Sequence, residues 1–128
     1  MILFDTHAHL DDEAFDAERD DMIRRAREAG VNHIVNVGYD LESSQRSIEL
    51  AEKHDMIYAA VGIHPHGASE AGAGYLNDLE KLASHPKVVA LGEMGLDYYR
   101  DLSPRPVQQQ VFLEQLVLAK KLGLPIII

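Results

Sequence analysis

The chain has 128 residues, a formal net charge of −9 and no cysteine. This length allows one domain with its own hydrophobic core, and we expect residues 1–128 to form a single domain. The absence of cysteine excludes disulfides and thiolate zinc sites, so any metal must be held by His, Asp or Glu side chains. It also fits a reducing compartment, and we expect a cytoplasmic protein.

The negative charge excludes a broad basic surface of the kind that grips long nucleic acids. A nucleic-acid substrate would have to bind in a local pocket, where bound cations offset the carboxylates. No apolar stretch is long enough to span a membrane, and no positively charged segment precedes the first apolar run. We therefore expect neither a membrane span nor a signal peptide.

Apolar runs and helical periodicity alternate along the chain, which predicts strands and helices in turn. The unit length of about 25–35 residues suits βαβ elements, and the alternation predicts a parallel sheet covered by helices. In chain order, the patterns predict a strand that opens at 1–4 and an amphipathic helix that has an acidic start at 10–13 and continues through 15–29. A strand at 31–37, a helix at 41–54 and a strand at 56–63 follow. After a loop at 67–74, the patterns predict a short helix at 75–84, a strand at 88–91, a helix at 107–122 and a strand at 124–128.

Polar residues gather where three of the predicted strands end. Candidate catalytic and metal-binding residues at the carboxyl ends of successive parallel strands are typical of a (β/α)8 barrel. A dinucleotide-binding fold has little support, because no G-x-G-x-x-G follows the first strand. The strand-end residues are His7 and His9, then His64 and His66, then Glu93 and Asp97.

The stretch after the first apolar run predicts a metal site. In a regular strand, Asp5, His7 and His9 share one face while Thr6 and Ala8 take the other. Two histidines at this spacing are about 6.5–7 Å apart at their backbones. Both rings can then turn one nitrogen to within about 2.0–2.1 Å of the same cation. The alternative is a pair of solvated histidines at a strand end, which an adjacent aspartate and a buried strand disfavour.

Three motifs resemble a known family. D-T-H-A-H-L at 5–10, G-I-H-P at 62–65 and G-E-M-G-L-D-Y at 92–98 are similar to the TatD-type metal-dependent deoxyribonucleases of the amidohydrolase superfamily. Taken alone, the first motif is weak evidence for this family and the last is fairly specific. All three motifs match the family in order and spacing along the whole chain. The resemblance implies a barrel that hydrolyses phosphodiester bonds of DNA with water activated by two divalent cations.

The chain departs from the family in length. A typical barrel needs about 250 residues, and this chain has 128. The family's further metal-binding His after the fifth strand, and a later His and Asp, have no counterpart because Ile128 is the last residue. We therefore expect an α/β fold that is roughly half of a (β/α)8 TIM barrel, with about five parallel strands and four helices.

The resemblance implies a role for each motif residue. His7 and His9 resemble ligands of the first cation, and Glu93 resembles the bridging, catalytic carboxylate. His64 and His66 resemble groups that contact the substrate phosphate. The chemistry of Glu93 agrees, because the two oxygens of one carboxylate can hold two cations about 3.5–4 Å apart.

Four further residues are candidates for supporting roles. Asp5 and Asp97 could orient the metal-binding side chains by hydrogen bonding without binding the metal themselves, although Asp5 could equally cap its strand. Tyr98 and Arg100 could meet a base and a phosphate, since Arg matches phosphate geometry. For His66, Tyr98 and Arg100, a solvated loop residue is the open alternative. We expect the remaining histidines, His33, His54 and His85, to be structural, and the core to include Ile48, Val111, Phe112, Leu116 and Ala119.

The cofactors implied are two divalent cations. Magnesium or manganese suits the carboxylates and zinc suits the imidazoles, so the sequence does not choose among them. Three ligands remain for the first cation and only Glu93 for the second, so we expect weak binding. The 128-residue chain by itself is expected to be weakly active or inactive.

The expected substrate is DNA, single-stranded or at its ends. Exposed edges at the first strand and at 124–128 predict that two copies pair, unless the chain is part of a longer protein. Two other functions stay open. One is an amidohydrolase-type enzyme that acts on a small ester, amide or phosphoester, and the other is a truncated, inactive fragment that survives as an interaction module.

Overall fold

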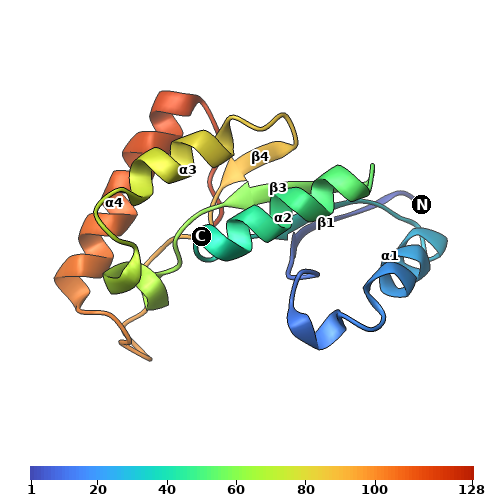
Figure 1. Cartoon of the computed structure of the whole chain (residues 1–128), viewed down its shortest axis with the longest axis horizontal. Helices are drawn as coiled ribbons and strands as arrows, with labels where there is room; N and C mark the ends of the chain where they lie inside the picture. Colours follow the sequence, from blue (N-terminus) through green and yellow to red (C-terminus); the bar gives the residue numbers. More distant parts are fainter.

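The computed structural model describes residues 1–128 and alternates strands with helices along the chain (Figure 1). No helix combines the length and apolar character needed to cross a membrane. The strands are β1 (Leu3–Ala8), β2 (Val31–Val37), β3 (Ile57–Val61) and β4 (Val88–Leu91). The α-helices are α1 (Arg19–Glu28), α2 (Leu41–Lys53), α3 (Tyr75–Ala83) and α4 (Arg105–Leu122), and the short 3-10 helices are η1 (Glu13–Phe15) and η2 (Pro65–Glu70).

The four strands form one parallel sheet in chain order, β1-β2-β3-β4. A helix connects each strand to the next, which is the usual crossover connection between parallel strands. The predicted α/β architecture is confirmed. Because β3 lies beside β4, the segments that follow these two strands emerge at the same edge of the sheet.

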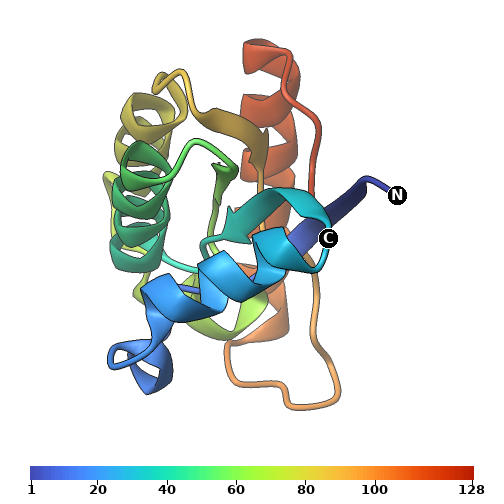
Figure 2. The ribbon, with the colours of Figure 1, turned by 90° about the vertical axis from the view of Figure 1, so that its right-hand side faces the viewer.

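The two faces of the sheet differ in what covers them. Residues such as Ile34, Ala59 and Leu91 join the helices in the main core, to which α2 contributes Ile48. Figure 2 shows α2 and α3 side by side along this part of the molecule. Strand residues on the opposite face of the sheet form a smaller second cluster, made of Val37, Ala60 and Ala90 with Val35 and Ile127. The predicted core positions are confirmed: Val111 and Ala119 are buried, and Phe112 and Leu116 pack against the core.

The predicted strand at 124–128 is reduced to a single bridge. Ile126 pairs with Leu91 in parallel, so the segment does lie beside β4. Three backbone hydrogen bonds hold it: Leu91 donates to Pro125, Ile127 donates to Leu91, and Met94 donates to Ile127. The ladder does not extend toward the start of β4, because Pro125 has no N–H to donate.

The predicted first helix was too long at its start. Residues Glu13–Phe15 form a separate 3-10 turn, which begins where the side chain of Asp12 accepts the Ala14 N–H. The guanidinium of Arg19 binds the backbone carbonyls of Leu10 and Asp12, which a continuous helix would have paired with N–H groups. The α-helix therefore begins only at Arg19. The loop expected at 67–74 also contains part of the second 3-10 helix.

Glycines at the ends of β3 and β4 let two backbones touch. A Cβ on Gly62 would lie 2.6 Å from the carbonyl carbon of Gly92 and 2.7 Å from its Cα. A Cβ on Gly92, where φ is +151°, would meet the carbonyl oxygen of Ile127 at 2.6 Å. These approaches are closer than a side chain allows, so the two glycines bring the segments after β3 and β4 together.

We predict that Gly62→Ala destabilises the fold. The added methyl group meets backbone atoms, which cannot rotate away, and overpacking of this kind costs about 1–3 kcal/mol. Urea unfolding followed by circular dichroism measures the change in the free energy of unfolding.

Gly67→Ala is the matched control, because a Cβ there meets nothing within 4 Å. It should change the free energy of unfolding by less than about 0.5 kcal/mol, the usual range for unconstrained surface positions. Equal effects of the two substitutions would contradict the close-approach explanation.

Candidate metal centre

The end of β1 departs from a regular strand where its histidines begin. The pairing with β2 shifts register between Asp5 and Ala8. The simple alternation that would place Asp5, His7 and His9 on one face therefore does not hold through this stretch. The carboxylate of Asp5 accepts the backbone N–H of His7 at 3.1 Å, so Asp5 contacts the backbone of a candidate ligand and not its ring.

Glu93 follows β4 directly, in the segment where Gly92 approaches the chain end. Its backbone N–H donates to the carbonyl of Gly38, the residue after β2, at 2.8 Å. Its side chain is 23% exposed. A partly buried carboxylate fixed through its own backbone has a defined direction, and here it points toward the end of β1.

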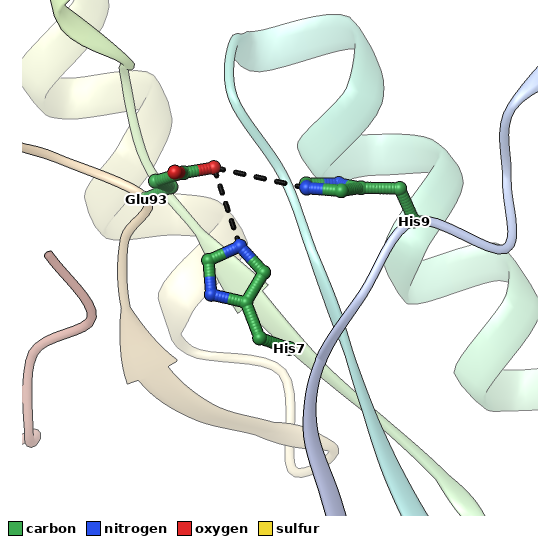
Figure 3. Close-up of side chains that lie close together, drawn as sticks. All are labelled: His7, His9 and Glu93. Atoms are coloured by element: carbon green, nitrogen blue, oxygen red, sulfur yellow. Dashed lines mark ion pairs between the residues drawn. The ribbon is translucent and has the colours of Figure 1, made fainter.

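The structure brings the side chains of His7, His9 and Glu93 together (Figure 3). Nε2 of His7 lies 3.4 Å from Oε2 of Glu93, and Nε2 of His9 lies 3.8 Å from the same oxygen. One candidate ligand atom from each residue lies within 4.8 Å of the others. This is the convergence that the sequence predicted for residues more than eighty positions apart.

The spacing of these atoms fits a divalent cation. Ligands held at 2.0–2.2 Å in a tetrahedral arrangement are about 3.3–3.6 Å apart, close to the observed distances. Two imidazoles and a carboxylate are also a donor set that divalent transition metals accept. The three residues can therefore hold a cation with small rotations of their side chains.

The backbone of β2 determines which nitrogen of His9 is free. Nδ1 of His9 lies 2.9 Å from the carbonyl oxygen of Val37. A carbonyl can only accept, so Nδ1 carries the proton, and in the neutral ring Nε2 keeps its lone pair. Such a contact orients the ring of a ligand histidine and fixes its tautomer. The lone pair of His9 is thus on the side that faces Glu93.

His64 faces the other oxygen of the same carboxylate. Its Nε2 lies 3.9 Å from Oε1 of Glu93. Its Nδ1 accepts the backbone N–H of His66 at 3.1 Å, so the neutral ring carries its proton on Nε2. Burial lowers the pKa of His64 below its ordinary value, against the opposing charge of Glu93, and this favours the neutral form. His64 therefore presents a hydrogen-bond donor to the site, whereas His9 presents a lone pair.

His66 is turned away from the cluster toward Asp97. Nε2 of His66 lies 2.5 Å from Oδ2 of Asp97, and the two imidazoles of His64 and His66 meet edge to face. The other oxygen of Asp97 accepts the backbone N–H groups of Tyr99 and Arg100. The Arg100 N–H, followed by the His66 ring, holds the pKa of Asp97 below its usual value. This pair ties the segment after β3 to the segment after β4.

The remaining candidates lie outside the cluster. Tyr98 is partly exposed, accepts a hydrogen bond from Gln109 and carries the Arg105 guanidinium over its ring. The Arg100 side chain is exposed and forms no hydrogen bond or ion pair with the cluster. The other histidines have separate partners: His54 pairs with Asp20, His85 pairs with Glu52, and His33 stacks on Phe4.

A cleft of about 740 Å³ opens beside the cluster. His9, His64, His66 and Glu93 contribute to its wall, and no Lys or Arg does. Its acidic lining also comes from Asp11, Asp12, Asp40, Glu42 and Glu70. Without bound cations, this cleft would repel an anionic ligand.

Residues at the end of β2 contact the cluster, and the sequence did not single them out. Their contribution is mostly backbone: Val37 accepts from the His9 ring, Gly38 accepts from Glu93, and Tyr39 accepts the His64 N–H at 2.8 Å. The side chain of Asn36, which is fully buried, bonds to the segment after His9. The available signal was position alone, because a strand between two strands with functional ends should also end at the site.

Comparisons with known proteins show which family the chain belongs to. The family model described as TatD related DNase matches residues 4–128. The chain is 47% identical over 127 residues to "Uncharacterized metal-dependent hydrolase YabD" of Bacillus subtilis, covering 99% of this chain and 50% of that protein. It is 41% identical over 124 residues to "3'-5' ssDNA/RNA exonuclease TatD" of Cronobacter turicensis, covering 97% of this chain and 47% of that protein.

A solved structure gives the same result. The crystal structure of YJJV, a TatD homolog from Escherichia coli, superposes with a TM-score of 0.86 at 37% identity, covering 97% of this chain and 49% of that one. The chain thus spans about half the length of the relatives it matches, and its sheet and helices correspond to half of their barrel-like fold. The match over nearly every residue, together with the His-x-His and Gly-Glu motifs at the strand ends, shows that the chain belongs to the TatD-related DNase family.

Proposed function

We propose that this protein is a metal-dependent hydrolase that cleaves phosphodiester bonds of DNA. One observation carries the proposal. Nε2 of His7 and of His9 converge on one oxygen of Glu93, while the other oxygen faces His64. A carboxylate approached from both sides in this way suits a site that binds two cations and a phosphate between them.

Each residue has a proposed part in the reaction. His7, His9 and Glu93 would hold the first cation, and the carboxylate of Glu93 would also be available as a ligand of a second. When bound, such a cation pair lowers the pKa of a water molecule and neutralises charge on the phosphate. His64 donates its Nε2–H to a phosphate oxygen, which stabilises the negative charge that develops there.

We propose two divalent cations per site, bound with unequal affinity. The cluster offers three ligands to the first cation, and Glu93 alone offers its second oxygen to the other. Manganese, magnesium and zinc are all compatible with two imidazoles and a carboxylate. The second cation should therefore bind only weakly to this chain.

The proposed substrate is single-stranded DNA or a DNA end. A relative of whose length this chain covers 47% is named a 3'-5' ssDNA/RNA exonuclease, which supports a single-stranded nucleic acid. The cleft is local and acidic, with no Lys or Arg in its wall, which suits a short stretch of nucleic-acid strand whose charge is neutralised by cations. We further propose that the protein acts in the cytoplasm, in keeping with a sequence free of cysteine.

We also propose that two copies of this chain associate through their sheet edges. β1 lies at the end of the strand order; Ile2, just before it, and Phe4, within it, are 68% and 66% exposed. Figure 2 shows the N-terminal end of β1 projecting from the rest of the molecule. An apolar strand edge of this kind favours pairing with another chain.

We predict that Glu93→Gln and His7→Ala each weaken manganese binding by about tenfold or more, the scale of loss when a metal site is disturbed. The first removes the charge on which both histidines converge, and the second removes one imidazole. Isothermal titration calorimetry with Mn²⁺ measures the change.

His54→Asn is the matched control, because His54 pairs with Asp20 away from the cluster. It should bind Mn²⁺ as the parent chain does. Two tight sites in the parent, or full binding by Glu93→Gln, would contradict the proposed arrangement.

We predict slow, cation-dependent cleavage of a single-stranded oligodeoxynucleotide by this chain. Gel electrophoresis of an end-labelled strand with Mn²⁺ or Mg²⁺ gives the rate, and chelation or His7→Ala should abolish it. A matched oligoribonucleotide and a small phosphodiester test the substrate class. Faster hydrolysis of the small ester would favour the other hydrolase function, and no cleavage of any substrate would leave only cation binding.

We predict a dimer in solution. Gel filtration with light scattering should give twice the 14.3 kDa of one chain. Ile2→Lys should shift the mass to that of a monomer, because a charge on a strand edge opposes pairing. Leu102→Lys is the matched control, being 64% exposed in the segment after β4 and not on the β1 edge. A monomeric parent at millimolar concentration would overturn this prediction.

A further inference from the structure

Residues 36–39, the last two of β2 and the two that follow it, contact the segments that carry the candidate ligands. Val37 binds the His9 ring, Gly38 binds the backbone of Glu93, and Tyr39 binds the backbone of His64. β2 is the strand between β1 and β3, so its end lies between the segments that carry these residues. The fourth member, Asn36, acts through its side chain.

Asn36 is fully buried, and its amide is completely engaged. Oδ1 accepts the backbone N–H of Leu10 at 2.5 Å. Nδ2 donates to Oδ1 of Asp11 and to Oγ of Ser47 in α2, each at 2.8 Å. The second oxygen of Asp11 accepts from Nε of Arg46 at 3.1 Å. Each polar atom of the amide thus has a partner, and two of the three bonds go to the segment directly after His9.

These contacts decide where the backbone of His9 can be. Ala8, on one side of it, pairs with Asn36 in the sheet, and Leu10, on the other side, is bonded to the Asn36 side chain. Beyond Ala8 the strand ladder supplies no restraint, because the register of β1 shifts between Asp5 and Ala8 and the strand ends at Ala8. Asn36 and Val37 together therefore hold His9 at backbone and ring.

We propose that Asn36 is a positioning residue for the candidate metal ligand His9. The proposal rests on the proposed function, because it concerns the same cation site. Asn36 fixes the 9–11 segment so that Nδ1 of His9 reaches the Val37 carbonyl and Nε2 faces Glu93. A buried amide that served only the core would tie β2 to α2 and would leave cation affinity unchanged when altered.

Exchanging the amide of Asn36 with the carboxylate of Asp11 distinguishes a role in positioning His9 from a role in the core alone. Asn36→Asp keeps an acceptor for the Leu10 N–H but sets a second carboxylate against Asp11, where Nδ2 now donates. Adding Asp11→Asn restores the pair, because the new amide at position 11 can donate to the new carboxylate at position 36 and still accept from Arg46. The single variant should bind Mn²⁺ about tenfold or more weakly, and the double variant should recover to within about threefold of the parent.

Ser47→Ala is the matched control. It removes the bond from Asn36 to α2 and leaves both bonds to the 10–11 segment, so Mn²⁺ affinity should stay within about twofold of the parent, well short of the loss expected when a supporting contact to a ligand is broken. Calorimetry is performed at a temperature where circular dichroism shows each variant folded. If Asn36→Asp does not fold, Asn36→Ser replaces it, because a hydroxyl is too short to reach both Leu10 and Asp11.

Nitrogen-15 spectra of the imidazoles give a readout that needs no cation. In the parent and the double variant, His9 should show one neutral tautomer with its proton on Nδ1, and in the single variant it should show a mixture. His85, which pairs with Glu52, should be unchanged in all of them.

The outcomes distinguish this proposal from the proposed function. A parent chain that binds no Mn²⁺ contradicts the metal centre, and the His9 tautomer in the variants then still decides the role of Asn36. A parent that binds, with a folded Asn36→Asp or Asn36→Ser variant of equal affinity and unchanged His9 tautomer, overturns the positioning role alone. Loss of affinity in Ser47→Ala equal to that in Asn36→Asp would also overturn it.

Discussion

The parallel pairing of β1 through β4 is the constraint on which the site depends. All four strands run in one direction and lie in chain order, so their carboxyl ends meet at one edge of the sheet. His7 and His9 at the end of β1 thereby face Glu93 at the end of β4, across the ends of the two strands between them. Close contact between Gly62 and Gly92 brings the ends of β3 and β4 together, since a side chain at Gly62 would overlap the backbone of Gly92.

Backbone carbonyls and amides, more than charged side chains, set the chemistry of the imidazoles. The Val37 carbonyl accepts a hydrogen bond from Nδ1–H of His9, so the lone pair of this ring is at Nε2. The backbone N–H of His66 donates to Nδ1 of His64, so the donor of this ring is at Nε2. The same residue type therefore presents a metal-binding atom on one side of Glu93 and a hydrogen-bond donor on the other. A hydrolytic phosphate site needs both.

The charge of the molecule limits how it can meet a polyanion. The net charge is −9, and the cleft beside the centre contains carboxylates and no Lys or Arg. Cations held by the cluster would be the nearest positive charges to a bound phosphate. Substrate affinity and catalysis would then depend on the same ions, so both should fall together when the ions are removed.

Strand and helix order, the parallel sheet and the grouping of His7, His9 and Glu93 were all predictable from the sequence, because apolar periodicity and strand-end motifs are local properties. Tertiary structure decided the rest. The segment around Ile126 forms one bridge and no strand, since Pro125 lacks the N–H that would extend the pairing, and His66 turns to Asp97. For the part played by the end of β2, the sequence offered only the position of this strand between two strands with functional ends, because any residue has a carbonyl and only the fold determines which side chain reaches it.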